Sequence, residues 1–319
     1  MENQQSPTLR AVDPSKLARE YRAEVRAGLQ RLGRPVKLCG FLSSEAPRPS
    51  RTYARYTRRG CEDVGITFEL REVPRLELEA AILEANADPE VHGLLVYYPV
   101  FGTQQDSWVK DLIDPGKDVE GLCTTWLRRL YENVRTDTHD PRKKAVLPCT
   151  PLAILKLLQD AGLHGSGPMP LAGRTISVFN RSEVVGRPLA AMLSNDGARV
   201  LSFDVHGPVE MRGKETLETT VERAEALALS DAIITGVPSR HFEVIRAAEL
   251  RDDQLCLNFS TVRNFSKEAE QRAGVFIPRV GPVTVAMVLR NTLRLFRNTR
   301  LEDPGLKESS RLDIPPPTH

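Results

Sequence analysis

The sequence has little of several features that mark large classes of protein. Its five cysteines form no Cys-x-x-Cys pair and are odd in number, so we expect reduced thiols and a cytoplasmic protein. No apolar run approaches the roughly 18 residues that cross a bilayer, so no membrane association is expected. The six histidines show no spacing typical of metal ligands, and no metal site is expected.

The chain also has no large excess of charge of one sign. The chain carries 44 Lys and Arg residues against 42 Asp and Glu residues, a formal net charge of +2. Proteins that bind nucleic acid or anionic membranes through their surface carry a strong positive excess, so neither partner is expected. Residues 1–16 contain Glu2 and Asp13 and no apolar core, unlike a secretory signal or an acid-poor presequence. The charged, proline-rich residues 301–319 are predicted to be a frayed tail.

Helical and strand patterns alternate along the chain, which predicts an α/β protein with a mostly parallel sheet covered by helices. A length of 319 residues suits two domains, and the charged insert at 136–144 with the following residues 148–151 marks the expected crossing. Thr150 is predicted to cap the next helix, with Pro151 in its first turn. The predicted helices are 14–32, 50–64, 76–86, 107–113, 152–161, 187–194 and 284–297; the predicted strands are 36–42, 66–72, 93–98, 175–179, 198–203, 231–234 and 255–259.

Residues 175–204 have the pattern of a nucleotide-binding βαβ unit. A strand is followed by a turn at 180–186 and a helix, and the second strand leads into Asp204. Asp204 lies 24 positions beyond Asn180, close to the roughly 20-residue offset at which a carboxylate accepts hydrogen bonds from an adenosine ribose. Because a 2′-phosphate would meet this negative charge, the sequence predicts NAD and not NADP.

The turn departs from the usual G-x-G-x-x-G fingerprint, because Asn180, Ser182 and Val185 stand where the glycines are expected. Asn180 can adopt positive φ and make a tight turn, and Ser182 can bond a pyrophosphate oxygen. An ordinary strand-turn-helix with no ligand is the alternative. Arg181 is predicted to contact the pyrophosphate, although it could also attract a 2′-phosphate.

The ends of two later strands complete the predicted cofactor site. Gly236 and Val237 follow one strand, and Asn258 ends the next. In α/β sheets, ligands bind at the carboxyl ends of the strands, so these residues are expected to contact NAD.

Five segments, in chain order, match the motifs of one family. They are residues 50–57 (SRTYARYT), 117–121 (KDVEG), 148–151 (PCTP), 180–188 (NRSEVVGRP) and 280–287 (VGPVTVAM). Together they resemble the methylenetetrahydrofolate dehydrogenase/cyclohydrolase family from about residue 9 to residue 297, with the greatest likeness to its monofunctional NAD-dependent members from fungi.

The resemblance implies two domains. Residues 1–149 plus 284–319 would bind folate, residues 150–283 would form a Rossmann-like NAD-binding domain, and the final helix would return to the first domain. Folate is expected in a cleft between the domains. The family also tends to dimerise through its nucleotide-binding domain, so a homodimer is expected.

The resemblance further implies the substrate contacts. Tyr53 would stack on the aminobenzoyl ring, and Glu120, where relatives carry Asp, would hold the amino-pyrimidine edge of the pterin. Tyr97, Asp118 and Pro282 would complete the substrate site. Without the resemblance, Tyr53 could equally be a packing residue. Asp118 also suits a role in capping its own loop.

The departures from the family pattern concern hydrolysis. Bifunctional members carry a Tyr-x-x-x-Lys motif, but Thr57 stands where the Lys would lie beside Tyr53 on one helix face. Tyr97 stands where the Gln partner of that Lys is expected. Thr57 cannot supply a titrating amine, so the catalytic set of Tyr53, Thr57, Tyr97 and Glu120 predicts dehydrogenase activity without cyclohydrolase activity.

The sequence therefore predicts an NAD-dependent oxidation of 5,10-methylenetetrahydrofolate to 5,10-methenyltetrahydrofolate in one-carbon metabolism. One alternative is a bifunctional dehydrogenase/cyclohydrolase that uses another base. The other is a silent folate- or nucleotide-binding regulator, because the segment 277–281 lacks the family's longer Pro-Gly-Gly loop near the cofactor.

Overall fold

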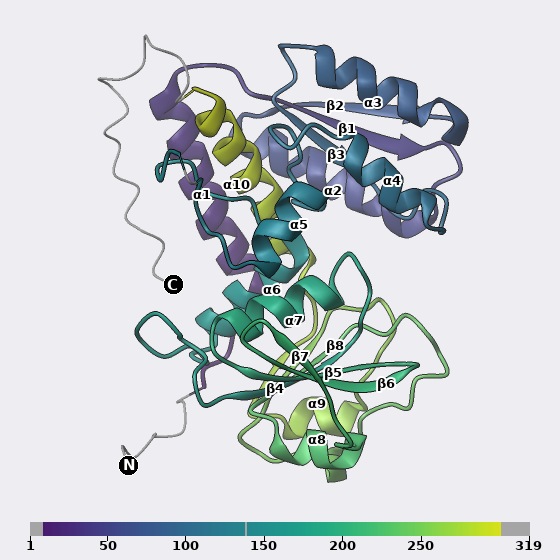
Figure 1. Ribbon diagram of the computed structural model, residues 1–319, viewed down its shortest axis with the longest axis vertical. Coiled ribbons are helices and arrows are strands. Elements are labelled where there is room, and N and C mark those ends of the chain that lie inside the picture. The colour runs from purple at the N-terminus through teal and green to yellow at the C-terminus, as the bar shows by residue number, and fades with distance from the viewer. Residues whose placement is uncertain (1–8, 138, 301–319) are drawn as a thin grey trace. The chain divides into compact units, whose positions relative to one another are not determined.

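A computed structural model describes residues 9–137 and 139–300, so the predicted tail at 301–319 lies outside the described residues (Figure 1). The chain divides into two compact units. Among the described residues, one consists of residues 9–17 and Thr150–Gly281, and the other of Ala18–Cys149 and residues 282–300. The predicted α/β class with two domains is confirmed. Residues 9–17 group with the unit that carries the nucleotide-binding pattern.

The Ala18–Cys149 unit is built on a small parallel sheet of order β2-β1-β3. Its strands are β1 (Lys37–Ser43), β2 (Thr67–Val73) and β3 (Gly93–Val96). Its helices are α1 (Pro14–Leu32, from Ala18 onward), α2 (Arg48–Val64), α3 (Leu78–Ala87), α4 (Gln105–Leu112), α5 (Thr124–Tyr131) and most of α10 (Gly281–Arg300), with a 3-10 turn at Arg75–Glu77.

The sequence of α2 explains why this helix forms and what it packs against. It starts with a proline in its first turn and ends at Gly65, whose φ of 89° is the left-handed conformation that glycine adopts without strain. Its buried face includes Ala54, Thr57 and Gly60. A Cβ at Gly60 would lie 2.8 Å from Val285 of α10, so glycine allows the two helices to approach closely.

The other unit contains a seven-stranded sheet of order β10-β9-β8-β4-β5-β6-β7. Five of its strands are parallel, whereas β6 and β7 form an antiparallel edge. The strands are β4 (Thr175–Phe179), β5 (Arg199–Asp204), β6 (Gly207–Arg212), β7 (Glu215–Glu218), β8 (Ala232–Thr235), β9 (Leu255–Asn258) and β10 (Val275–Ile277). The helices are α6 (Cys149–Asp160), α7 (Gly186–Asn195), α8 (Arg223–Leu229) and α9 (Lys267–Arg272), with a 3-10 turn at Ala247–Glu249.

The predicted helices and strands lie within a few residues of observed ones, but α5, α8, α9, β6, β7 and β10 were not predicted, and two helix starts are wrong. The β6–β7 hairpin was not predicted, because all four residues of β7 are exposed and show no apolar alternation. Helix α6 begins at Cys149, so Thr150 is its second residue and not its N-cap. Helix α10 begins at Gly281, three residues before the predicted start.

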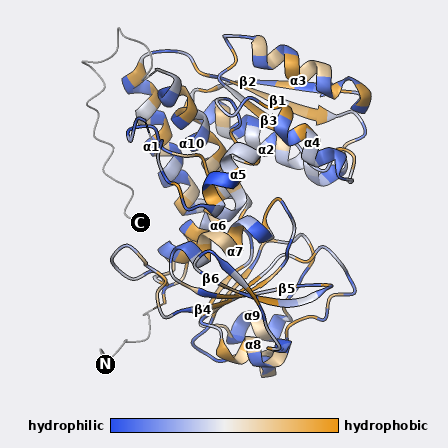
Figure 2. Cartoon of the chain, in the orientation of Figure 1, coloured by the Kyte–Doolittle hydropathy of each residue, from blue (hydrophilic) through white to orange (hydrophobic). Residues whose placement is uncertain are grey.

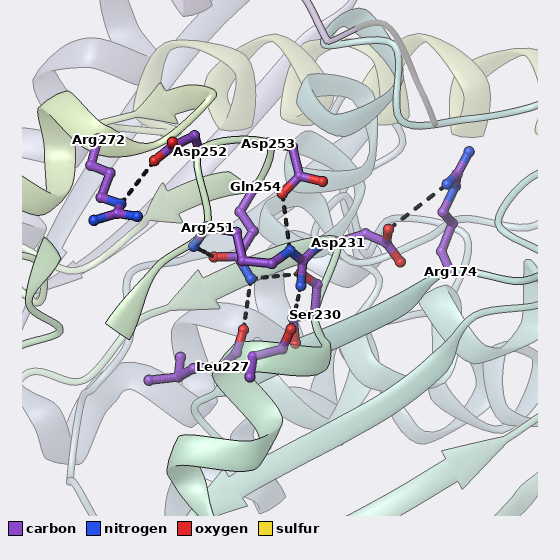
Figure 3. Close-up of polar contacts among 10 residues, drawn as sticks. Arg174, Leu227, Ser230, Asp231, Arg251, Asp252, Asp253, Gln254 and Arg272 are labelled. Atoms are coloured by element: carbon purple, nitrogen blue, oxygen red, sulfur yellow. Dashed lines mark hydrogen bonds and ion pairs between the residues drawn. The ribbon is translucent and has the colours of Figure 1, made fainter. Parts of the chain in front are cut away.

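Apolar residues concentrate on the sheet strands of both units (Figure 2). All residues of β3, β8 and β9 are buried. Gln254, just before β9, is a buried polar residue that is fully satisfied (Figure 3). Its amide nitrogen donates to the carbonyls of Leu227 and Ser230 at 2.6 and 2.8 Å, and its oxygen accepts from the backbone N–H of Arg251 at 2.8 Å. These bonds fix the end of α8 to the start of β9.

Within residues 9–137 and 139–300, no helix is both long enough and apolar enough to cross a membrane.

Candidate active site

Two tyrosines from different elements meet in the Ala18–Cys149 unit. Tyr53 comes from α2 and Tyr97 follows β3, and their rings lie nearly perpendicular with centroids 5.4 Å apart. Both hydroxyl groups are buried and have no hydrogen-bond partner among the described residues. Burial raises the pKa of both phenols well above the ordinary value, so both remain neutral donors. Tyr53 is half-buried and Tyr97 is buried, so a ligand can reach this pair through the Tyr53 ring and not through Tyr97.

Thr57 lies one turn after Tyr53, on the buried face of α2. It is completely buried, and its hydroxyl donates to the Tyr53 carbonyl at 3.1 Å. This back-bond to residue i−4 occupies its only proton. Thr57 therefore presents no titrating group to the space beside the tyrosines.

Asp118 organises the loop after α4. Its buried carboxylate accepts four backbone N–H bonds, from Glu120, Gly121, Leu122 and Cys123, at 2.8–3.0 Å. These bonds use the carboxylate's acceptor capacity within its own loop. The structure thus supports the loop-capping alternative for Asp118, which holds Glu120 in place.

Glu120 lies in a narrow crevice next to that loop. Burial, reinforced by the neighbouring Asp118 carboxylate, raises its pKa to about 8, while Lys110 acts in the opposite direction. The crevice is also lined by Tyr98 and by apolar side chains that include Leu94 and Val96. A carboxyl group in such surroundings can accept hydrogen bonds from the N–H groups of a flat heterocycle.

Sequence reasoning missed three residues of this region. Lys110 and Tyr98 line the crevice, and the Lys110 ammonium lies 5.8 Å from the Tyr98 ring centroid. The sequence did carry a signal for Lys110, because this lysine lies on the buried side of a short amphipathic helix. Asn291 of α10 donates to the carbonyls of Val119 and Leu147 at 2.9 and 3.0 Å, and no local pattern indicated this contact.

Pro282, which was predicted to belong to the substrate site, lies half-buried in the first turn of α10.

The turn between β4 and α7 is closed by its own side chains. The Asn180 side-chain oxygen accepts from the backbone and hydroxyl of Ser182, at 3.0 and 2.8 Å. The Ser182 hydroxyl accepts from the backbone N–H groups of Val185 and Gly186. The expected positive φ at Asn180 is wrong, because Asn133 is the only non-glycine residue of the described chain with this conformation. Hydrogen bonding, not a left-handed backbone, makes the turn tight.

Asp204 is the last residue of β5, as predicted, and forms an ion pair with Arg181. Its other oxygen accepts from the backbone N–H of His206 at 2.7 Å. The Arg181 guanidinium also donates to the carbonyls of Ser202 and Gly207, at 2.6 and 2.7 Å. Arg181 is therefore turned toward the end of β5, where the ribose was expected, and not toward the phosphate turn.

Gly236, Val237 and Asn258 meet at the carboxyl ends of β8 and β9. The Asn180 amide donates to the Gly236 carbonyl at 2.8 Å, which links these strand ends to the phosphate turn. A Cβ at Gly236 would overlap with the ring of Phe259, so only glycine fits there. The Asn258 side chain bonds within its own loop, donating to the Val262 carbonyl. The structure thus brings all predicted cofactor residues to one edge of the sheet.

No group of three or more His, Cys, Asp or Glu side chains suited to a metal ion occurs in the described part of the chain.

Comparison with known protein families shows which family the chain belongs to. The tetrahydrofolate dehydrogenase/cyclohydrolase catalytic domain matches residues 12–120, and the NAD(P)-binding domain of the same family matches residues 148–242. The chain belongs to the tetrahydrofolate dehydrogenase/cyclohydrolase family. The resemblance seen in the five sequence motifs is therefore confirmed.

Relatives in this tetrahydrofolate dehydrogenase/cyclohydrolase family cover nearly the whole chain. The methylenetetrahydrofolate dehydrogenase (NAD+) of Schizosaccharomyces pombe is 39% identical over 90% of this chain and 92% of that protein. The enzyme of the same name from Dictyostelium discoideum is 40% identical over 90% of this chain and 94% of that protein. The solved structure of the NAD-dependent 5,10-methylenetetrahydrofolate dehydrogenase from Saccharomyces cerevisiae has a TM-score of 0.85 and 36% identity, covering 93% and 99% of the two chains.

Proposed function

We propose that this chain oxidises 5,10-methylenetetrahydrofolate to 5,10-methenyltetrahydrofolate with NAD and lacks cyclohydrolase activity. Relatives at 39% and 40% identity carry the name of the NAD-dependent dehydrogenase and extend over most of the chain. The observation that carries the proposal is the environment of Thr57. A buried threonine and the Tyr97 ring occupy the space where hydrolysis would require an amine and its partner.

Hydride transfer makes fewer demands on the protein than hydrolysis does. The hydride leaves a carbon between two nitrogens, and the resulting cation is delocalised over both, so no general base is needed. The chain must hold this carbon in position and exclude water. In this proposal the Tyr53 ring stacks on the aminobenzoyl group, and Glu120 accepts hydrogen bonds from the amino-pyrimidine edge of the pterin.

In this proposal the residues at the ends of β4 and β5 would hold the dinucleotide. NAD, when bound, supplies the hydride acceptor. Ser182 and the start of α7 provide a polar turn for the pyrophosphate, and the Asp204 side chain is 21% exposed, within reach of a ribose hydroxyl. The Asp204 charge supports NAD over NADP, because a 2′-phosphate would approach a carboxylate.

A single assay separates the proposal from its two alternatives. Purified chain is mixed with methylenetetrahydrofolate and either NAD or NADP, and the absorbance of reduced cofactor and of methenyl product is followed. The proposed enzyme accumulates both with NAD, with methenyl product decaying only at its spontaneous rate. A bifunctional enzyme removes the methenyl product faster than that rate, and a silent regulator forms neither species.

The proposal extends to domain roles, assembly and location. The Ala18–Cys149 unit with residues 282–300 would bind folate, and Thr150–Gly281 would bind NAD. The exposed edge of β7, whose outer backbone groups have no strand partner among the described residues, supports a homodimer through the NAD-binding unit. Light scattering after gel filtration tests this assembly. Five buried, unpaired cysteines support a cytoplasmic location, which microscopy of a tagged chain would test.

A further inference from the structure

A group of basic side chains gathers around α10, and none of them is assigned above to folate or NAD. We call it the α10 basic cluster; its members are Arg31, Lys144, Arg290, Arg294 and Arg297. Arg290, Arg294 and Arg297 follow the i, i+4, i+7 spacing and so share one face of the helix. Arg31 belongs to α1, which runs beside α10 (Figure 1), and Lys144 belongs to the charged insert.

Contacts with two neighbouring segments hold the cluster together. On one side, Arg294 donates to the carbonyl of Ala145 at 2.9 Å, and Asn298 donates to the carbonyl of Lys144 at 3.0 Å. These two bonds fix the charged insert to α10.

On the other side the arginines lie against α1. The Arg290 guanidinium lies 5.7 Å from the ring centroid of Tyr21. A Cβ at Gly28 would come within 2.9 Å of an Arg297 guanidinium nitrogen, so that group rests on the α1 backbone. The cluster is therefore a packed feature of the fold and not a set of freely moving surface chains.

The described part of the chain gives the cluster no counter-charge. Within the described residues, no Asp or Glu oxygen lies within 4.0 Å of a charged nitrogen of any of its five members. Arg22 and Arg26 of the same unit both pair with Asp63, at 3.0 and 2.8 Å. Arg48, Arg55, Arg58 and Arg59 of α2 have no acidic partner among the described residues either, so the α10 basic cluster is one of two groups of unpaired cations in this unit.

Burial and mutual repulsion disfavour the charged forms of the cluster. Burial, with repulsion from Arg290 and Arg297, lowers the pKa of Arg294 to about 10. Burial, with repulsion from Arg294 and Arg290, also lowers the pKa of Lys144. The pKa of Arg297 is lowered by burial and by Arg31. Half-buried like charges without a partner are costly, and an anion would relieve that cost.

We propose that the α10 basic cluster binds a phosphate-class oxyanion, either free inorganic phosphate or the phosphate groups of a nucleotide. One carboxylate, with a charge of −1, would neutralise only part of the charge of several neighbouring cations. A phosphate group carries about −1.5 to −2 and would neutralise more of it. The planar guanidinium donors match phosphate oxygens two at a time. None of its members is a proposed folate or NAD contact, so the bound anion would stabilise this unit without entering the reaction.

Thermal unfolding of the full chain at constant ionic strength tests the proposal. Sodium chloride is replaced in parallel samples by inorganic phosphate, by inorganic pyrophosphate and by adenosine triphosphate without divalent cations. We expect the effective anion to raise Tm by about 3 °C or more. A response to phosphate or pyrophosphate identifies a free inorganic ligand, and a response to the nucleotide alone identifies a nucleotide.

Two cluster variants and one matched control locate the effect. Arg290→Gln and Arg297→Gln should each abolish the rise, and each should raise Tm in chloride because a repelling charge is removed. Arg55→Gln removes the same charge from an exposed arginine of α2 and should keep the full rise. If no anion raises the wild-type Tm, or if the rise persists in both cluster variants, the proposal is wrong. A rise that persists would place the anion elsewhere, for example at the turn before α7.

Discussion

Arg181 and Asp204 form an ion pair with 3.0 Å between Nη1 and Oδ2 at the end of β5. The arginine comes from the turn before α7, and the aspartate ends the next strand, so the pair joins the expected phosphate and ribose regions of the cofactor site. Both side chains are largely shielded, with 14% and 21% exposure. The carboxylate thus holds a guanidinium that would otherwise be free to attract a second anion.

The first prediction concerns cofactor choice. Asp204→Ser removes the carboxylate that repels a 2′-phosphate and releases Arg181 to pair with that phosphate. We expect the preference of kcat/KM for NAD over NADP, worth about 2–4 kcal/mol in the wild type, to shrink or reverse. The double variant Asp204→Ser with Arg181→Leu is the control, and it should lose the gain with NADP. Equal kcat/KM for both cofactors in the wild type would contradict the assignment.

The second prediction concerns the missing cyclohydrolase. Thr57→Lys should give weak or no hydrolysis, because position 57 is completely buried and the buried Tyr97 ring would hinder the longer side chain and its amine. Combining Thr57→Lys with Tyr97→Gln should give more activity. The measurement is the loss of methenyltetrahydrofolate above its spontaneous rate. Turnover by the wild type in this assay would show that another residue supplies the base.

Local pattern predicted much of the fold and part of the site. Alternation of strand and helix placed β4, α7 and β5, and an offset of 24 positions placed Asp204 at the end of its strand. These features depend on neighbours in sequence. Gln254 and Asn291 could not be found in this way, because Asn291 contacts carbonyls that lie 172 and 144 positions away.

The direction in which a side chain points could also not be predicted from the sequence. Arg181 was placed correctly in the turn, but its guanidinium donates to the carbonyl of Gly207. Gly207 begins β6, part of a hairpin that was not predicted because its sequence is polar. Asp118 shows the same limit. Its four bonds depend on how the following loop folds back, which residue types alone do not determine.

The third prediction concerns the pH dependence of stability. Burial raises the pKa of Glu120 to about 8 in the folded chain, above its value when unfolded. The folded state therefore binds more protons between these values, so this group's contribution is fully present below the unfolded pKa and is lost as pH rises through about 8. Glu120→Gln, which cannot ionise, should remove that loss. We expect the variant to gain up to about 4 kcal/mol relative to the wild type between pH 5 and pH 9, measured by urea unfolding without ligand. An unchanged difference between the two proteins across this range would contradict the raised pKa.

The fourth prediction separates loop organisation from substrate contact at Asp118. Asp118→Ala leaves four backbone N–H groups without their acceptor, three of them in buried bonds three to five residues away. We expect a loss of about 3–5 kcal/mol in the free energy of unfolding, with KM for folate rising because Glu120 loses its support. Asp118→Asn keeps one acceptor oxygen and should lose less. Glu120→Gln is the matched comparison, since it should change KM without a large loss of stability at neutral pH. If Asp118→Ala raised KM while leaving unfolding unchanged, Asp118 would be a direct substrate ligand and not the residue that shapes the loop.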